Sequence, residues 1–256
     1  MNCLSYLKFF LLVLAILFSF GSRLYAEDLV ASLALIPMHS QIGNSGQPEG
    51  GFVKVAKAID DVYKNGEISI EQYPFSRSLD NVVSGKADFH IPLIKIPHVS
   101  EETLPFAYAT ERITQVTFVL YTRADSPPLD KNELSQHVIE TVRGHKQLFL
   151  FEAAEVSSLD QGIKKLLHGR IDAFIMEQDA VDSYIREQKY KNIRRTFFAS
   201  WDTCVVIPKG PKQQEIDQIL STALRRLKAS GRLQEITKSI HQPYIDWQPY
   251  KMASWQ

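Results

Sequence analysis

One acidic residue, Glu177, directly follows an apolar run, and this position makes it the strongest candidate for chemistry in the chain. The run Ala173–Met176 predicts a buried strand, and a carboxylate at the end of such a strand is costly unless it has a partner. Glu177 is therefore a candidate acceptor for the amine of a bound ligand. Alternatively, it complements the dipole of the helix expected over Asp179–Tyr190.

Three basic residues also lie where the chain leaves a predicted strand. Arg77 opens a helix after the strand Ile68–Tyr73, and its guanidinium group has the planar shape that pairs with a carboxylate. Lys95 follows an apolar strand and offers a positive point charge, whereas Arg143 ends a strand beside Gly144 and suits anion recognition. These residues are candidate ligand contacts, although solvated surface cations are equally ordinary at such positions.

A polar loop follows the first predicted strand and contains His39. Ser40, Asn44 and Ser45 lie in the same loop, so these side chains are candidates for contacts at the mouth of a cleft. The glycines of the segment GNSGQPEGG do not form a phosphate-binding loop, because the closing Gly-Lys-Ser/Thr is missing. Chain reversal explains these glycines more simply.

Two segments of the chain have nearly the same sequence: GKADFHIP at 85–92 and GRIDAFIM at 169–176. We call this the repeated phrase. The apolar residues before each phrase share one spacing: Leu79, Val82 and Val83 in the first case, Ile163, Leu166 and Leu167 in the second. Offsets of three and four place such residues on one helix face, and a glycine just beyond them is the usual helix stop. The repeat therefore predicts a helix, a tight turn and a buried strand in two places, unless two ordinary units resemble each other by coincidence.

Strand and helix signals alternate along the rest of the chain. Further strands are expected at Leu29–Ile36, Asp88–Ile96, Val116–Tyr121, Val138–Val142 and Cys204–Ile207, and further helices at Phe52–Ile59, Arg77–Ser84, Ile216–Leu227 and Leu233–Ile240. This alternation favours an α/β fold with open, mostly parallel sheets. Because such sheets bind ligands at the carboxyl ends of their strands, two facing lobes would share one cleft.

The first 26 residues predict a secretory signal peptide. Lys8 precedes a mostly apolar stretch from Phe9 to Phe20, and the small residue Ala26 precedes charged residues, which places cleavage after Ala26. This stretch of twelve residues is shorter than the roughly 20 that cross a membrane, so an uncleaved anchor is the lesser alternative. We expect a periplasmic protein.

Charge and cysteine content limit the partners of the exported chain. Removing Lys8 and Arg23 from the 29 basic residues leaves 27 against 29 acidic residues, a net charge of −2. This balance gives no strong attraction to nucleic acid. Only Cys204 remains after cleavage, so the protein has no internal disulfide and must depend on its core. We expect a monomer.

Sequence signatures of catalysis are missing. The chain has no G-x-S-x-G, H-E-x-x-H or C-x-x-C motif. His90 and His98, eight residues apart, lack the spacing of metal ligands. We therefore expect no catalytic residue, no metal and no cofactor.

Several weak motifs occur in an order that is fairly specific. PFSR at 74–77 precedes the first repeat, GKAD and GRIDA open the two repeated strands, and VVIPKG at 205–210 precedes two closing helices. In this order the chain resembles the type II periplasmic solute-binding proteins, in particular family 3, which includes polar amino-acid receptors of ABC transporters. The resemblance covers nearly all of the exported chain.

The resemblance implies a two-lobed fold with two hinge crossings. Lobe 1 would comprise residues 27–112, lobe 2 residues 113–201, and the return segment 202–256 would rejoin lobe 1. Trp201 would then lie at the second crossing, where it either walls the cleft or packs in the hinge. The aromatic residues of the tail, among them Tyr244, would pack on lobe 1.

The family's binding residues carry over only in part. The family's carboxylate that pairs with a ligand ammonium falls on Glu177, but the position of its carboxylate-binding arginine holds Ser100. The small polar turn of lobe 2 corresponds to 143–145. The ligand therefore stays unnamed.

We expect an exported protein that captures a small polar or zwitterionic molecule for an ABC-type uptake system. The alternatives are a sensory module for a membrane kinase and, less favoured, a lyase or dehydratase on the same fold. The expected ligand contacts are Glu177, Arg77, Lys95, Arg143, His39 and Trp201.

Overall fold

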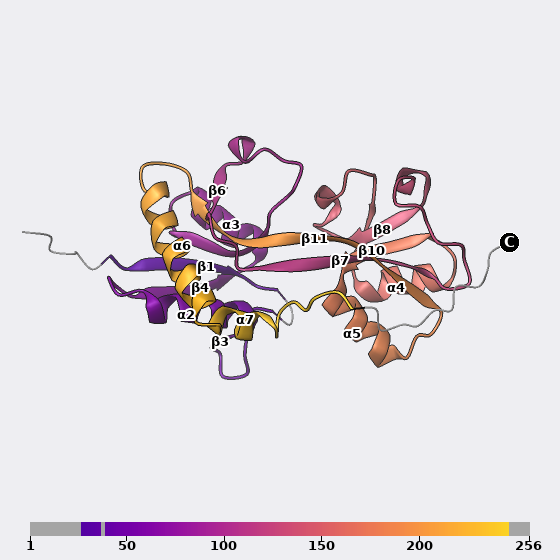
Figure 1. Cartoon of the computed structure of the whole chain (residues 1–256), viewed down its shortest axis with the longest axis horizontal. Helices are drawn as coiled ribbons and strands as arrows, with labels where there is room; N and C mark the ends of the chain where they lie inside the picture. Colours follow the sequence, from indigo (N-terminus) through magenta and orange to yellow (C-terminus); the bar gives the residue numbers. More distant parts are fainter. Residues whose placement is uncertain (1–26, 37–38, 246–256) are drawn as a thin grey trace, which may run out of the picture.

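Two long antiparallel strands, β7 (Thr114–Arg123) and β11 (Ile193–Pro208), run through the middle of the protein and connect its two halves (Figure 1). The computed structural model describes residues 27–36 and 39–245. Thr114–Arg123 pairs with Ile193–Thr203, and β11 then continues into the other half, where it pairs with two further strands. The two halves therefore share one hydrogen-bonded ladder.

A single nine-stranded sheet forms within the described residues. Its order is β4 (Ile68–Tyr73), β1 (Leu29–Ala34), β5 (Phe89–Ile94), β11, β7, β10 (Ala173–Glu177), β8 (Ile139–Val142) and β9 (Ala154–Val156), with β6 (Phe106–Tyr108) also paired to β11. We call the half that contains β4, β1 and β5 lobe 1 and the half that contains β10, β8 and β9 lobe 2. Strands are parallel within these two groups, as the sequence predicts, and the antiparallel pair β7–β11 makes the two sheets continuous.

Helices cover the sheet in both lobes (Figure 1). They are α2 (Gly51–Val62), α3 (Phe75–Val83), α6 (Gln213–Ala229) and α7 (Arg232–Thr237) in lobe 1, and α4 (Leu159–Leu167) and α5 (Gln178–Gln188) in lobe 2. The short elements are the hairpin β2 (Gln41–Ile42) and β3 (Pro48–Glu49) and the 3-10 turns η1 (Glu101–Thr103), η2 (Leu134–Gln136) and η3 (Lys146–Leu148). No helix of the described residues is long and apolar enough to cross a membrane.

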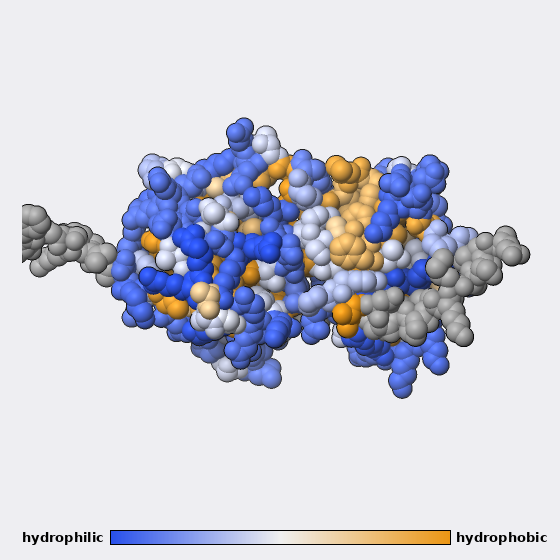
Figure 2. All heavy atoms as spheres, in the orientation of Figure 1, coloured by the Kyte–Doolittle hydropathy of each residue, from blue (hydrophilic) through white to orange (hydrophobic). Residues whose placement is uncertain are grey.

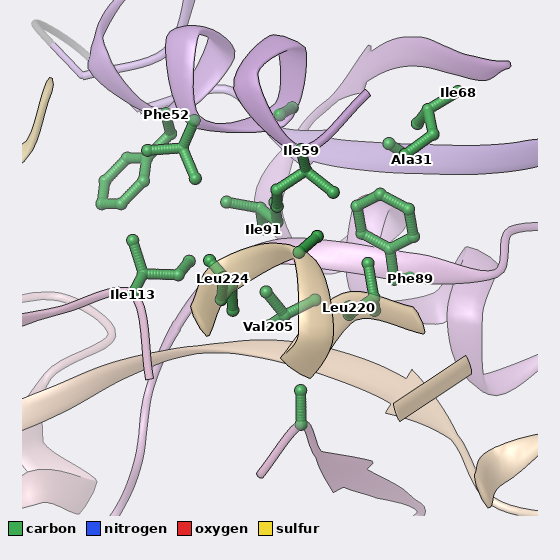
Figure 3. Packing of buried hydrophobic residues seen from close by; sticks show 14 of the residues in the cluster. Ala31, Phe52, Ile59, Ile68, Phe89, Ile91, Ile113, Val205, Leu220 and Leu224 are labelled. Carbon is green, nitrogen blue, oxygen red and sulfur yellow. The ribbon is translucent and has the colours of Figure 1, made fainter. Parts of the chain in front are cut away.

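The core of lobe 1 has two layers because strand side chains alternate between the faces of the sheet. Val205 and Ile207 of β11 pack with α2, α6 and α7, as Figure 3 shows for Val205. Cys204 and Val206 face the opposite layer, where they meet Val82 of α3. Burial raises the pKa of the Cys204 thiol to about 12, so this thiol stays protonated and unreactive.

Lobe 2 has its own apolar core. Buried residues of β7, β8, β10, α4 and α5 form one cluster, in which every residue of β10 is buried. Gly162 of α4 allows close packing, since a Cβ there would lie 2.3 Å from the ring of Phe174. The two lobes therefore have separate apolar cores.

The repeated phrase forms the same unit in both lobes, which confirms the prediction. Gly85 and Gly169 end α3 and α4 with φ angles of 71° and 66°, a region that favours glycine. The aspartate that follows also has one role: Asp88 binds the backbone of Val30 through its own N–H and its carboxylate, at 2.9 and 2.8 Å. Asp172 binds Val138 with the same two distances. Each aspartate thus fixes the register between neighbouring parallel strands.

The repeat generates a stability prediction. Asp88→Ala leaves the backbone N–H of Val30 without its partner, so we expect a loss of about 1–3 kcal/mol in the free energy of unfolding. Asp172→Ala should cost less, because Asp172 is exposed and water replaces the lost bond. Urea unfolding of both variants measures the difference. Equal, negligible losses would show that these aspartates do not hold the strands.

One strand is much longer than predicted. The sequence indicates only Cys204–Ile207, whereas β11 spans Ile193–Pro208. The missed segment has a half-exposed centre, because it crosses between lobes where helices do not cover both faces. Without one consistently buried face, this segment lacks the alternation of apolar and polar residues that predicts a strand.

His90 lies fully buried on β5. Its Nε2 donates to the carbonyl of Pro92 at 3.1 Å, so in the neutral ring Nδ1 accepts the hydroxyl of Ser78 at 2.7 Å. Burial lowers the pKa of His90 from 6.5 to about 4, because the charged ring loses its hydration. Between these pH values the unfolded chain binds a proton that the folded protein excludes.

The protein should therefore lose stability as pH falls from about 6.5 to 4. The shift of His90 corresponds to about 3 kcal/mol, fully present as stability above pH 6.5 and lost by pH 4. Urea unfolding as a function of pH should show a flatter profile for His90→Gln than for the wild type. Parallel profiles would mean that His90 titrates normally in the folded protein.

Candidate functional site

The segment after α7 crosses from lobe 1 to lobe 2 and ends beside α5 (Figure 1). The Tyr244 ring lies 5.6 Å from the ring of Phe197, and the guanidinium of Arg195 lies 5.0 Å from its centre. The prediction that this tail packs on lobe 1 is therefore wrong for Tyr244, which packs against the core of lobe 2. The other tail aromatics, Trp247, Tyr250 and Trp255, lie outside the described residues.

Backbone groups of this segment, residues 241–245, bind polar side chains of lobe 2. Gln242 N–H donates to Asp179 Oδ2 at 3.1 Å, and its carbonyl accepts from Gln178. The carbonyl of Ile245 accepts from Arg195 at 2.9 Å. Together with β7 and β11, the segment is thus a third connection between the lobes.

A buried ion pair orients Arg195, the side chain that binds segment 241–245. Arg195 and Asp182 are 1% and 7% exposed, with 2.5 Å between Nη2 and Oδ2. The hydroxyl of Tyr121 also donates to Asp182, at 2.8 Å. Burial, followed by the charge of Asp182, raises the pKa of Tyr121 well above 10, so the phenol stays a donor.

Removing one partner of this pair should be costly. We expect Asp182→Asn to lower the free energy of unfolding by about 3 kcal/mol, because it leaves the charge of Arg195 buried without its counterion. The matched control is Asp160→Asn, which breaks an exposed pair with Lys164 and should cost much less, because solvent screens that pair. Thermal and urea unfolding give both values, and similar losses would contradict the assigned role.

Glu177 lies at the junction of lobes, where β10 ends and α5 begins. Its side chain is 9% exposed and caps α5 by accepting the N–H groups of Asp179 at 2.6 Å and Ala180 at 3.2 Å. The prediction that Glu177 interacts with the start of the following helix is thus confirmed. It leaves the ligand role open, because each carboxylate oxygen has a further lone pair.

His241, from the segment after α7, faces Glu177 across the junction. Its Nδ1 lies 3.8 Å from Glu177 Oε1 and 3.6 Å from Asp179 Oδ2. Burial raises the pKa of Glu177, and His241 opposes this shift. For His241, burial lowers the pKa, but the nearby carboxylates of Asp179 and Glu177 outweigh this effect and raise the pKa. The junction thus favours a proton or another cation between these groups.

His39 adds a second imidazole on the side of lobe 1. Its ring lies 5.3 Å from the ring of His241 and 6.2 Å from that of Phe52. Burial, assisted by the charge of His241, lowers the pKa of His39 to about 4. His39 is therefore neutral near pH 7 and has a lone pair available.

Two cavities lie beside the crossing segment. One has a volume of about 230 Å³ and is lined from both lobes, by His39 and Lys238 on one side and Asp179 and Ser183 on the other. The second has a volume of about 480 Å³ and lies against β7 and β11, next to Thr117 and His241. Both volumes are large enough for a small polar molecule or several waters.

The structure gives two of the predicted basic residues partners other than Glu177. Arg77 is exposed and lies 5.5 Å from the ring centre of Tyr73. Lys95 pairs with Glu101 at 3.2 Å, and Arg143 is exposed. Among described residues no contact joins any of the three to Glu177, so their roles in ligand binding stay predictions.

Trp201 belongs to an aromatic group of lobe 2. Its ring lies 4.8 Å from Phe118, 5.9 Å from Phe149 and 6.0 Å from Phe198. Figure 2 shows apolar residues gathered on this side of lobe 2, near the loop between β8 and β9. Trp201 thus packs within lobe 2, and both its hinge-packing role and its role as a cleft wall stay predictions.

Sequence reasoning missed two members of the junction, Asp179 and His241. Asp179 was assigned only to the start of a helix, although it lies two residues after Glu177. His241 gave no signal, because nothing in the sequence relates the end of the chain to β10. Of the predicted residues, the structure brings together Glu177 and His39, with His241 between them.

Two α/β lobes, joined by long strands and meeting at a polar junction, define a two-lobed binding protein. The chain matches the family model of bacterial extracellular solute-binding proteins, family 3, over residues 30–242. The match covers most of the chain, so the protein belongs to this family. A comparison with curated proteins gives no match.

Solved structures share the fold. The arginine-, lysine-, histidine-binding protein ArtJ from Geobacillus stearothermophilus is 17% identical, with a TM-score of 0.59 over 86% of this chain and 98% of that one. The GluR0 ligand-binding core from Nostoc punctiforme, in complex with (L)-glutamate, is 17% identical, with a TM-score of 0.61 over 84% of this chain and 100% of that one.

A histidine kinase sensor domain with similarity to periplasmic binding proteins is 18% identical, with a TM-score of 0.62 over 84% of this chain and 96% of that one. A substrate binding protein of an amino acid ABC transporter is 17% identical, with a TM-score of 0.58 over 83% of this chain and 98% of that one. Their fold is the type II periplasmic binding-protein fold, which the sequence predicts for this chain.

Proposed function

We propose that this protein is exported to the periplasm and captures a small polar solute that carries a cationic or amine group between its lobes. The observation that carries the proposal is the buried carboxylate of Glu177, which ends β10 at the lobe junction with Asp179 beside it. A cation is the partner that offsets the cost of burying these carboxylates. The 230 Å³ cavity next to Asp179 gives a small solute room beside them.

Closure of the lobes would trap the solute. We place the bending at Arg112–Gln115 and Ala199–Thr203, where the two hinge strands cross between lobes. Asp202 holds this crossing by accepting from Arg112 at 2.9 Å and Gln115 at 3.0 Å. Short segments of this kind can absorb a rotation while the two separate cores stay rigid.

The solute class can be tested directly. Thermal shift and calorimetry with arginine, lysine, histidine and glutamate should show stabilisation by at least one amine-rich member of this set. Glu177→Gln should then weaken that binding by about 10- to 100-fold, since a charge-assisted hydrogen bond contributes about 1.5–3 kcal/mol. The fold should survive, because glutamine keeps the shape of the side chain and one acceptor for the cap.

The matched control is Glu187→Gln, the same substitution at an exposed position of α5. It should leave affinity unchanged. Small-angle scattering should show a smaller radius of gyration with the bound solute. Unchanged affinity of Glu177→Gln, together with a lower melting temperature, would reduce Glu177 to a helix cap and contradict its assignment.

Capture of this kind serves an ABC-type uptake system in our proposal, and no turnover of the solute is expected. A sensor role would share the capture step and differ in the membrane partner. In-cell cross-linking separates the two: recovery of a permease supports uptake, whereas recovery of a membrane kinase supports sensing.

A further inference from the structure

We propose that Glu177, Asp179 and His241 form a binding site for a divalent transition-metal ion at the lobe junction. One ligand atom from each residue lies within 4.8 Å of the others. Two carboxylate oxygens and one imidazole nitrogen make a donor set that suits zinc. The inference extends the proposed function, because the ion would occupy the position of the cationic group at Glu177.

The imidazole supplies independent evidence for a missing partner. The side chain of His241 is 7% exposed, and its buried Nδ1 has no hydrogen-bond partner. This atom faces the two carboxylates at 3.6 and 3.8 Å, which are ion-pair distances too long for hydrogen bonds. A buried nitrogen without a partner is costly, and an ion bound to all three groups would satisfy it.

The surrounding bonds orient the carboxylates for such a role. Asp179 N–H and Ala180 N–H fix the two oxygens of Glu177. Gln242 N–H fixes Asp179 Oδ2 at 3.1 Å. Outer hydrogen bonds of this kind hold the ligands of known metal sites, and here they leave lone pairs on each carboxylate.

The positions of the ligands imply a consequence for closure. Glu177 and Asp179 belong to lobe 2, whereas His241 follows α7 and lies 5.9 Å from the ring of Phe52 in the core of lobe 1. An ion bound by all three would therefore join the lobes. Three protein ligands also leave a coordination position open to water or to a donor atom of a solute.

The test is zinc binding by calorimetry to the purified, tag-free protein after treatment with a chelator. We expect one ion per chain and a higher melting temperature with zinc. His241→Gln and Asp179→Asn should each weaken binding about 100-fold or more, since even an outer-shell change costs about 10- to 100-fold. His168→Gln, a histidine exposed at the end of α4, should bind like the wild type.

Circular dichroism establishes that each variant is folded before its affinity is compared. Absence of zinc binding in the wild type, or equal binding by wild type and His241→Gln, would overturn the inference. The result is separable from that of the proposed function. If the protein binds an amine but not zinc, the proposed function holds and the metal site is wrong. If it binds zinc but no amine, the metal site holds and the proposed solute class is wrong.

Discussion

The pairing of β7 with β11 is the constraint on which the rest of the structure depends. These strands exchange backbone hydrogen bonds with each other across the middle of the molecule and with the outer strands of both lobes. Backbone groups inside a sheet must be paired, so the lobes cannot separate without breaking this ladder. The closure proposed above would rotate the lobes about the half-exposed centre of β11.

Polar groups gather where the lobes meet because the chain crosses there three times. Asp202 lies on the crossing strand β11. Arg112 neutralises its charge, and Gln115 donates a hydrogen bond to it. The crossing segment 241–245 brings backbone groups that need partners, and the side chains of α5 and Arg195 provide them. The lobe junction is therefore polar for a structural reason, and a ligand site there uses groups that the fold already orients.

The proposed site assigns two purposes to one residue, Glu177. Glu177 caps α5, which accounts for its position at the end of a buried strand. The same cap holds its oxygens at the junction, beside Asp179 and 3.8 Å from His241. A structural role and a binding role thus do not compete at this position, since the cap uses only part of the acceptor capacity of the carboxylate.

The sequence by itself determined the local units and their order. Apolar spacing and the glycine stops predicted α2, α3, α4 and most strands, and the two repeated phrases became equivalent units because Gly85 and Gly169 permit the same turn. Periodicity records which face of an element is buried, so such units can be read locally. The tertiary structure alone decided the length of β11, the course of the C-terminal segment and the meeting of His241 with Glu177 and Asp179. These features depend on contacts between distant parts of the chain, and local patterns carry no record of them.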